Sequence, residues 1–315
     1  MVSVINGIER RWALRVALMV ITLWGGFSWS SARGDAALKS APTLSDESQK
    51  LWRSLIAQAD VLNLPTGFLK TISPGFVTLE FDDLHAFAAE YHPDEHRMVL
   101  NRTLSFNAAG GTLKTLASLP PRDLGTLYHE LFHAYMDYIS RGALQHDAKS
   151  PPARLLAFAK DRQECRYRYV SITPILQRKN RTETRFLTDR ESWEALNEAW
   201  AVFVGWAVWT HQELWKISQN GGKTHAAERE WLTRLKKADR DGDLIGYYEP
   251  EDSAEQMIAR KRYLAPSHRM SPQEVALLLE YVLEYPREEA RRSAKVMEQN
   301  RPSLSGSPPC TIAPP

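Results

Sequence analysis

The sequence predicts an α+β fold that is predominantly helical, with a small N-terminal β-sheet and a C-terminal helical lobe. Two observations support this prediction. Between residues 75 and 101, β-branched and aromatic residues occur in short runs bounded by turn-forming residues, which is the pattern of strands. From Pro121 to about Met297, apolar residues recur mostly at helical spacing. Strand signals are thus concentrated in the first third of the chain, ahead of a long helical part.

Composition sets the broad class of the protein. The chain has 315 residues, of which 43% are hydrophobic and 25% charged, and its net charge is +2. These values are ordinary for a soluble globular protein and allow a sizeable core. A net charge near zero argues against a nucleic-acid partner. We expect one domain over residues 42–298, with the β-containing part at 42–141 and the helical lobe at 150–298; the oligomeric state is left open.

The N-terminal segment resembles a secretory signal peptide. Three arginines within the first fifteen residues precede an apolar run at 16–24 and small residues that end at Ala32. Because the run is shorter than the roughly 20 residues that span a bilayer, we expect residues 1–32 to be removed and to leave no stable membrane span. The protein is then exported, to a periplasm or outside the cell, an uncleaved anchor being the alternative. Whether Cys165 and Cys310 pair is left open.

The elements of the first part follow in order along the chain. A capping serine and early acids predict a helix over 45–60. Residues 75–81 are expected to form a strand, and the runs 85–91 and 96–101 are expected to form a hairpin around a Pro-containing turn. Pro121 suits the first turn of a helix, and the apolar spacing carries this helix to Tyr138.

The second part is expected to be helical. A basic, helix-leaning stretch runs over 153–190 and is interrupted by Pro174. An apolar helix follows over about 190–218, and two or three further helices extend to Met297. The segment 299–315 is rich in Pro and Ser and is expected to be disordered.

The segment His129-Glu130-Leu131-Phe132-His133 lies within the predicted helix that begins at Pro121. Its two histidines are four residues apart, so on a helix they project from one face, one turn apart. Two imidazoles so placed can bind one Zn²⁺ ion, with Glu130 beside them as a general base. Zinc lowers the pKa of a bound water towards neutrality, and the glutamate can take and return its proton.

Two rival metal sites fit the sequence less well. A di-iron carboxylate site needs a second Glu-x-x-His, and Glu130-x-x-His133 has no second copy in the chain. A metzincin site would continue the motif with Gly and a further His, but Met136 and Ile139 stand at those positions.

A catalytic zinc usually has a third protein ligand, and Glu198 is the preferred candidate. From Ala195 to Trp209 the predicted helix is apolar except for Asn197 and Glu198. A buried carboxylate costs several kcal/mol unless it is paired or bound to a metal, and coordination accounts for its presence. The alternatives for the third ligand are Glu194, Glu191 and His146.

The face of the predicted helix that carries Glu198 continues with residues of modest size. Ala201, Val202 and Gly205 lie three, four and seven positions after it. This spacing puts them on one side of the helix, so this helix can approach the histidine helix closely.

These two segments together resemble the gluzincin metallopeptidases, thermolysin-like enzymes among them. The likeness rests on His129-Glu130-Leu131-Phe132-His133-Ala134, on Asp137-Tyr138, and on Leu196-Asn197-Glu198-Ala199. It implies a zincin-like fold in which His129, His133 and Glu198 bind zinc and Glu130 acts on the water. Asp137 has a counterpart in the family, and we expect Asp137 and Asn197 to support the ligands through hydrogen bonds.

Two departures from the family pattern are visible. The third ligand lies much nearer the first motif in thermolysin-like enzymes, and Val202 stands where they carry an Asp that supports a zinc-bound imidazole. The family likeness also implies a strand that binds extended peptides; Met98–Asn101 is the candidate, and an ordinary strand in a small sheet is the alternative. It implies an oxyanion-stabilising Tyr or His; the candidates are Tyr247, Tyr248, Tyr263, His225 and His268.

One acidic segment resembles a calcium-binding loop. Asp239-Arg240-Asp241-Gly242-Asp243 starts like an EF-hand, but Leu244 and Pro250 occupy the positions of its Gly and Glu. We expect a solvated acidic turn here and keep calcium binding as the alternative.

The sequence thus predicts an exported zinc metallopeptidase that hydrolyses peptide bonds in a peptide or protein substrate. The alternatives are a non-catalytic zincin-like domain that binds a protein, and a zinc amidase acting on cell-wall material. Retention of Glu130 favours an enzyme, since a structural site has no need of a general base. Substrate preference and endo- or exopeptidase action are left open.

Overall fold

The computed structural model describes residues 46–85, 87–106, 112–142, 149–173, 181–219 and 224–300. The segment predicted as signal peptide lies outside these residues, as do His146, Cys310 and the part of the predicted C-terminal tail after Asn300. Cys165 is disulfide-bonded. The predicted class is confirmed: the fold is a mostly helical α+β arrangement with a small N-terminal sheet and C-terminal helices.

The N-terminal part consists of two helices and a three-stranded sheet. Its elements are α2 (Asp46–Val61), α3 (Gly67–Thr71), β1 (Thr78–Asp82), β2 (Ala89–His92) and β3 (Arg97–Asn101), followed by the 3₁₀ turns η2 (Arg102–Leu104) and η3 (Leu116–Ser118). The strand order is β1-β3-β2, with β1 parallel and β2 antiparallel to β3. The predicted hairpin is therefore confirmed, and β1 adds a third strand to it.

The central position of β3 contradicts one prediction. Met98–Asn101 lies in β3, which is bonded to β1 on one side and to β2 on the other. A strand with two neighbours has no free backbone groups for a peptide, so the prediction of strand addition at Met98–Asn101 is wrong. The edge strands are β1 and β2, and β2 contacts helix α4 (Pro121–Ser140).

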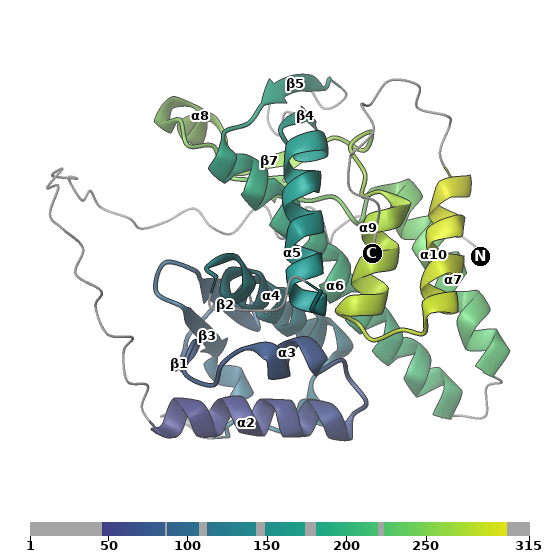
Figure 1. The fold of residues 1–315 in the computed structure, drawn as a ribbon. Coiled ribbons are helices and arrows are strands. Elements are labelled where there is room, and N and C mark those ends of the chain that lie inside the picture. Colours follow the sequence, from purple (N-terminus) through teal and green to yellow (C-terminus); the bar gives the residue numbers. More distant parts are fainter. Residues whose placement is uncertain are drawn as a thin grey trace, which may run out of the picture.

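Two long helices form the centre of the molecule. Helix α4 starts with Pro121 in its first turn, as predicted, and buries an apolar face that includes Leu127, Leu131 and Phe132. Helix α6 (Asp189–Gln219) packs along it and buries Trp200 and Phe203 completely. Each of these large apolar side chains contributes roughly 1.5–3 kcal/mol on burial, so the pair anchors the core. Figure 1 shows α4 and α6 between the N-terminal sheet and the C-terminal helices.

The stretch predicted as helix-leaning over 153–190 is only partly helical. It forms α5 (Pro151–Arg162), the π-helical turn η4 (Gln163–Tyr167) and the strands β4 (Tyr169–Thr173) and β5 (Glu183–Phe186). With β6 (Tyr247–Tyr248) and β7 (Arg262–Leu264) these strands make a second sheet, in the order β5-β4-β7-β6. The β-branched and aromatic residues of β4 alternate between buried and accessible positions, which suits a strand and outweighs the basic residues around it.

Helices complete the C-terminal part. They are α7 (Thr224–Asp241), α8 (Ser253–Ile258), α9 (Pro272–Tyr281) and α10 (Arg287–Gln299). The proposed calcium segment begins inside α7, where buried Asp239 pairs with Arg269 (3.5 Å) and contacts Asn300. Asp239, the first acidic residue of this segment, is therefore already paired with groups of the protein. No helix in the described ranges is long and apolar enough to cross a membrane.

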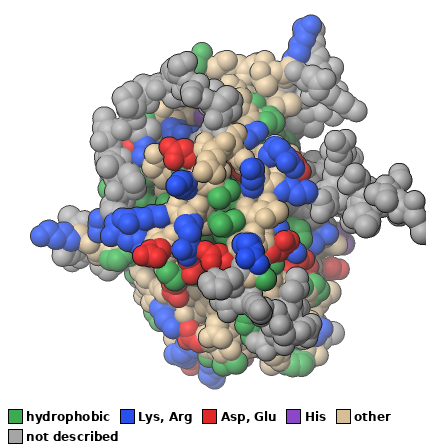
Figure 2. Space-filling model, turned by 90° about the vertical axis from the view of Figure 1, so that its right-hand side faces the viewer, with side chains coloured by type: hydrophobic (Ala, Val, Ile, Leu, Met, Phe, Trp, Pro, Cys, Tyr) green, Lys and Arg blue, Asp and Glu red, His purple; other side chains and the backbone are tan. Residues whose placement is uncertain are grey.

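The surface carries both signs of charge. Figure 2 shows Lys and Arg side chains interspersed with Asp and Glu on the face that it presents. On the C-terminal helices, ion pairs such as Arg292–Glu228 (2.8 Å) join neighbouring elements. This mixture agrees with the near-zero net charge of the chain.

Candidate metal centre

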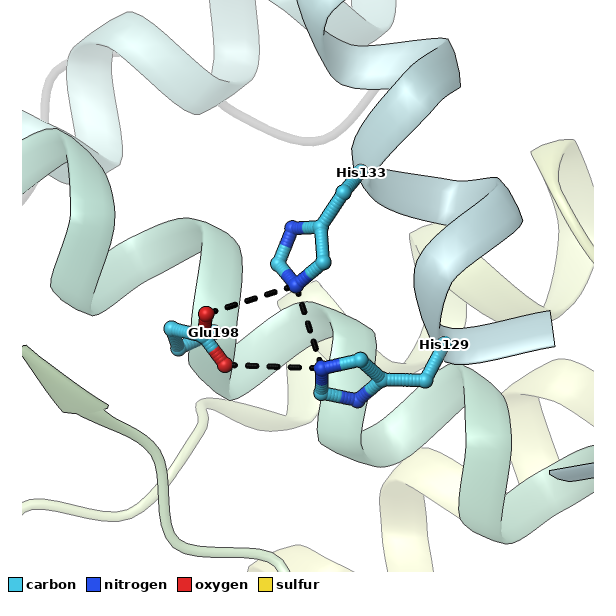
Figure 3. Close-up of side chains that lie close together, drawn as sticks. All are labelled: His129, His133 and Glu198. Atoms are coloured by element: carbon cyan, nitrogen blue, oxygen red, sulfur yellow. Dashed lines mark hydrogen bonds and ion pairs between the residues drawn. The ribbon is translucent and has the colours of Figure 1, made fainter. Parts of the chain in front are cut away.

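Two helices bring together His129, His133 and Glu198. The histidines project from α4 one turn apart, and Glu198 faces them from α6 (Figure 3). The Nε2 atoms of His129 and His133 are 3.1 Å apart. The carboxylate oxygens of Glu198 lie 3.5 Å from Nε2 of His129 and 3.4 Å from Nε2 of His133. Three residues predicted as ligands from the sequence therefore converge on one point.

The geometry of the three side chains fits a divalent metal ion such as zinc. Ligand atoms about 2.0–2.1 Å from a tetrahedral ion are about 3.3 Å from one another, close to the three distances observed. No other group of three or more His, Cys, Asp or Glu residues within the described ranges is arranged to hold an ion. Oε2 of Glu198 is buried and has no hydrogen-bond partner among the described residues. A metal ion satisfies this oxygen and both imidazoles together.

The neighbouring acids of α6 have other partners. Glu191 accepts hydrogen bonds from the backbone N–H of Thr188 (3.0 Å) and of Glu251 (2.9 Å). Glu194 accepts one from the N–H of Glu249 (3.1 Å), and burial raises its pKa to about 8. Both carboxylates fix backbone around β6, whereas Glu198 is the acid of α6 that faces the histidines.

Small residues let the two helices approach closely enough to form the site. A Cβ atom at Gly125 would lie 2.8 Å from the carbonyl oxygen of Gly205, and a Cβ at Gly205 would lie 2.7 Å from the carbonyl oxygen of Gly125. A Cβ at Gly205 would also lie 3.2 Å from Cβ of His129. The prediction that Gly205 permits close approach of the helices is confirmed. Gly125, its counterpart on α4, was not recognised in the sequence.

At this site, buried groups of opposite charge shift each other's pKa. Burial alone would raise the pKa of Glu198, but the imidazoles of His133 and His129 outweigh it and hold the pKa well below its usual range. Burial alone would lower the pKa of His133, and the Glu198 carboxylate reverses the effect and raises it. The carboxylate of Glu198 is thus kept ionised, the form in which it can bind a metal.

Glu130 is held beside the histidines by the edge strand. Its Oε2 accepts a hydrogen bond from the backbone N–H of Tyr91 in β2 (3.0 Å), and its Oε1 lies 3.9 Å from Nε2 of His129. Burial raises the pKa of Glu130, although both neighbouring imidazoles oppose this effect. One carboxylate oxygen is therefore fixed by the sheet while the other faces the metal centre. A backbone donor leaves no signal in the sequence, so Tyr91 could not be identified there.

Asp137 lies one turn beyond His133 and joins the hairpin to α4. Its Oδ2 accepts hydrogen bonds from the phenol of Tyr91 (2.6 Å) and from Nδ1 of His96 (2.7 Å), and its Oδ1 pairs with Arg141 (2.7 Å). Through Tyr91 it holds the strand that contacts Glu130. Asn197, the other residue predicted to support the ligands, has a buried Oδ1 without a hydrogen-bond partner among the described residues.

Tyr247 borders the centre from the second sheet. Burial, together with the nearby carboxylates of Glu198 and Glu130, raises the pKa of its phenol well above the usual range. Nζ of Lys261 donates to the same phenol oxygen (2.7 Å). Among the oxyanion candidates from the sequence, Tyr263 packs against Tyr247 with ring centroids 5.7 Å apart, and Tyr248 takes the opposite face of β6.

Two histidines were also candidates for the oxyanion-stabilising residue. His268 packs edge-on against Tyr167, with ring centroids 5.3 Å apart. The side chain of His225 lies outside the described part of the chain.

Comparisons of the chain with protein-family models, with curated proteins and with solved structures find no match.

Proposed function

We propose that the chain is a zinc-dependent metallopeptidase of gluzincin type. The observation that supports this best is the convergence of His129, His133 and Glu198 with the carboxylate of Glu130 beside them. A structural zinc site is usually closed by four Cys or His ligands and has no use for an adjacent base. A set of three ligands with a general base is the arrangement that hydrolysis requires.

His129, His133 and Glu198 would hold the metal. Bound zinc supplies a Lewis acid that polarises a carbonyl and lowers the pKa of a bound water. Glu130 takes the proton from the attacking water and passes it to the leaving amine. The bond from the Tyr91 N–H fixes one oxygen of Glu130, so the other oxygen stays directed at the reacting atoms.

The free edge of β2 is the proposed binding site for an extended peptide. The N–H of Asn101 donates to the carbonyl of Ala88 (2.9 Å), so alternate residues of β2 turn their backbone groups towards β3. In an antiparallel ladder the residues between them, Ala89 and Tyr91, turn theirs to the free edge. Tyr91 already uses its N–H for Glu130, which leaves Ala89 to bind substrate backbone by strand addition.

Tyr247 is the proposed stabiliser of the oxyanion that forms during hydrolysis. Its strand β6 packs against α6 next to Glu198, and the carboxylates of Glu198 and Glu130 raise the pKa of its phenol. A donor placed near developing negative charge typically contributes about 10²–10³ in kcat.

The test measures zinc content and hydrolysis of a peptide library by the wild type and by Glu130→Gln. We expect one zinc ion per chain in both proteins, and peptide cleavage by the wild type alone. Glu288→Gln, which changes an exposed acid of α10, is the matched control and should cleave like the wild type. A wild type that binds zinc but cleaves cell-wall amides instead of peptides would refute the proposed substrate class. Absence of bound zinc would refute the proposal as a whole.

A further inference from the structure

Tyr91 attaches the edge strand β2 to helix α4 at two points. Its backbone N–H donates to Oε2 of Glu130 (3.0 Å), and its phenol donates to Oδ2 of Asp137 (2.6 Å). Glu130 and Asp137 are seven residues apart in the helix, so they lie on the same side of it, two turns from each other. One residue of the strand thus contacts the helix both at the proposed base and two turns beyond it.

Asp137 accepts hydrogen bonds from two groups of the hairpin. An ionised carboxylate has no proton to donate, so the phenol of Tyr91 and Nδ1 of His96 are both donors to its Oδ2 (2.6 and 2.7 Å). Its Oδ1 pairs with Nε of Arg141 (2.7 Å). Burial and the Asp137 carboxylate raise the pKa of Tyr91, so the phenol keeps its proton. Because its acceptor is charged, the bond from Tyr91 is roughly twice as strong as one between neutral groups.

The turn that follows β2 is fixed to the C-terminal end of α4. Nη2 of Arg141 donates to the carbonyl of Pro93 (3.0 Å), and the ring centroids of His96 and Phe76 are 4.2 Å apart. His96 has a φ of +50°, a left-handed conformation that a non-glycine residue keeps only where its surroundings hold it. Its contacts with Asp137 and Phe76 supply this restraint. Asp137 therefore holds the turn as well as the strand.

The sheet alone does not set the distance between β2 and α4. Within the described part of the chain, β2 is paired with β3 on one side and with no strand on the other. The N–H of Tyr91 faces this unpaired side, where Glu130 accepts it. Because an N–H···O bond weakens beyond about 3.2 Å, a small outward shift of β2 would release the carboxylate. The second attachment, from the phenol to Asp137, opposes such a shift.

We propose that Asp137 is a positioning residue that keeps the carboxylate of Glu130 oriented for proton transfer by holding Tyr91. This inference rests on the proposed peptidase function and adds Asp137 and the phenol of Tyr91 to it. Both act through the backbone N–H of Tyr91, and neither touches the reacting atoms.

Steady-state kinetics test the consequence for hydrolysis. We expect Tyr91→Phe, which keeps the N–H and loses the phenol, to lower kcat about 10-fold with little change in KM or in zinc content. Asp137→Ala, which also frees the turn, should lower kcat about 10- to 100-fold. Since Asp137 acts through Tyr91, the double variant should be no slower than Asp137→Ala alone. Effects that multiply, or a loss that appears in KM only, would overturn the proposal.

Tyr128→Phe is the matched control for these variants. It also removes a phenol bond made by a tyrosine packed in this part of the core, because Tyr128 of α4 donates to the carbonyl of Pro65 (3.0 Å). This bond has no link to β2, so we expect kcat to be unchanged. An equal loss of kcat in Tyr128→Phe would mean that any missing phenol bond slows the enzyme, and would overturn the proposal.

Hydrogen exchange of the amide at position 91, followed by NMR, tests the positioning without reference to activity. In the wild type this amide faces the free edge of β2 and is protected by its bond to Glu130. We expect exchange about tenfold faster in Tyr91→Phe and in Asp137→Ala, and unchanged exchange in Tyr128→Phe. The amide of Asn101, which donates to the carbonyl of Ala88 across the hairpin (2.9 Å), is the internal reference and should stay protected in every protein.

The exchange result separates this inference from the proposed function. Equal exchange at position 91 in all of these proteins would overturn the role of Asp137 and leave the peptidase proposal intact. Faster exchange at Asn101 as well would mean that the whole hairpin opens, and would also overturn it. A wild type that cleaves no peptide, with faster exchange at position 91 in Asp137→Ala, would refute the peptidase function while the hold of Asp137 on the strand stands.

Discussion

Replacing Gly205 by Ala tests whether close helix packing builds the metal centre. In an exposed helix interior this change stabilises a protein by about 1 kcal/mol, because Ala is the better helix former. At position 205 the added Cβ would lie 2.7 Å from the carbonyl oxygen of Gly125 and 3.2 Å from Cβ of His129. The first contact is about 0.7 Å short of ordinary van der Waals distance, and its partner is backbone that cannot rotate away.

Relief of this clash must separate α6 from α4. Overpacking of a well-packed interface costs about 1–3 kcal/mol, so we expect a net loss of about 1–2 kcal/mol in the free energy of unfolding. The same movement withdraws Glu198 from His129 and His133. Since metal–ligand distances tolerate only about 0.2 Å, zinc affinity should fall at least about tenfold.

Urea unfolding of the metal-free protein and zinc competition with a chelator measure the two effects separately. Gly75→Ala is the control, because a Cβ at Gly75 meets nothing within 4 Å. We expect Gly75→Ala to match the wild type in both assays. A Gly205→Ala protein that is more stable than the wild type and binds zinc equally well would refute the packing argument.

Three further predictions address other parts of the structure. Gly246→Ala should lower kcat while zinc is retained. The added Cβ would lie 2.6 Å from the backbone of Ala199 and would push β6 and Tyr247 away from α6. Unchanged steady-state kinetics would contradict this prediction. Glu198→Ala should lower zinc affinity sharply while Glu194→Ala keeps it, as chelator competition can show; the reverse order would move the third ligand. Burial lowers the pKa of His268 to about 4, so stability should fall as pH drops from 6.5 towards 4, by at most about 3 kcal/mol. His268→Gln should flatten this part of the unfolding profile, and a slope equal to that of the wild type would contradict the assignment.

The sequence predicts the metal ligands because their constraints are local. His129 and His133 are one helical turn apart, and Glu198 is conspicuous as a carboxylate in an apolar helix. The small Gly205 on the same face likewise indicates close helix packing, which the contact with Gly125 confirms. Where helical periodicity and burial determine the structure, the residue pattern within one segment is sufficient to predict it.

The parts that the sequence does not predict depend on distant segments. The second sheet joins β4 and β5 to β6 and β7, which lie more than sixty residues further along the chain. Each strand is short, and the basic residues around β4 favoured a helix. Lys261 meets Tyr247 only because β6 and β7 pair, and Tyr91 reaches Glu130 through a backbone N–H that any residue carries. The choice of Met98–Asn101 as substrate strand was wrong because strand order, which decides the edge, is not encoded within one strand.

The central claim is that His129, His133 and Glu198 bind a single metal ion. The most direct measurement is the zinc content of the protein, by mass spectrometry, after loading with zinc and exhaustive dialysis. We expect one zinc ion per chain in the wild type and a large loss of zinc in His133→Ala, because three ligands are needed for tight binding. A wild type without bound zinc, or a His133→Ala protein that retains a full equivalent, would contradict it.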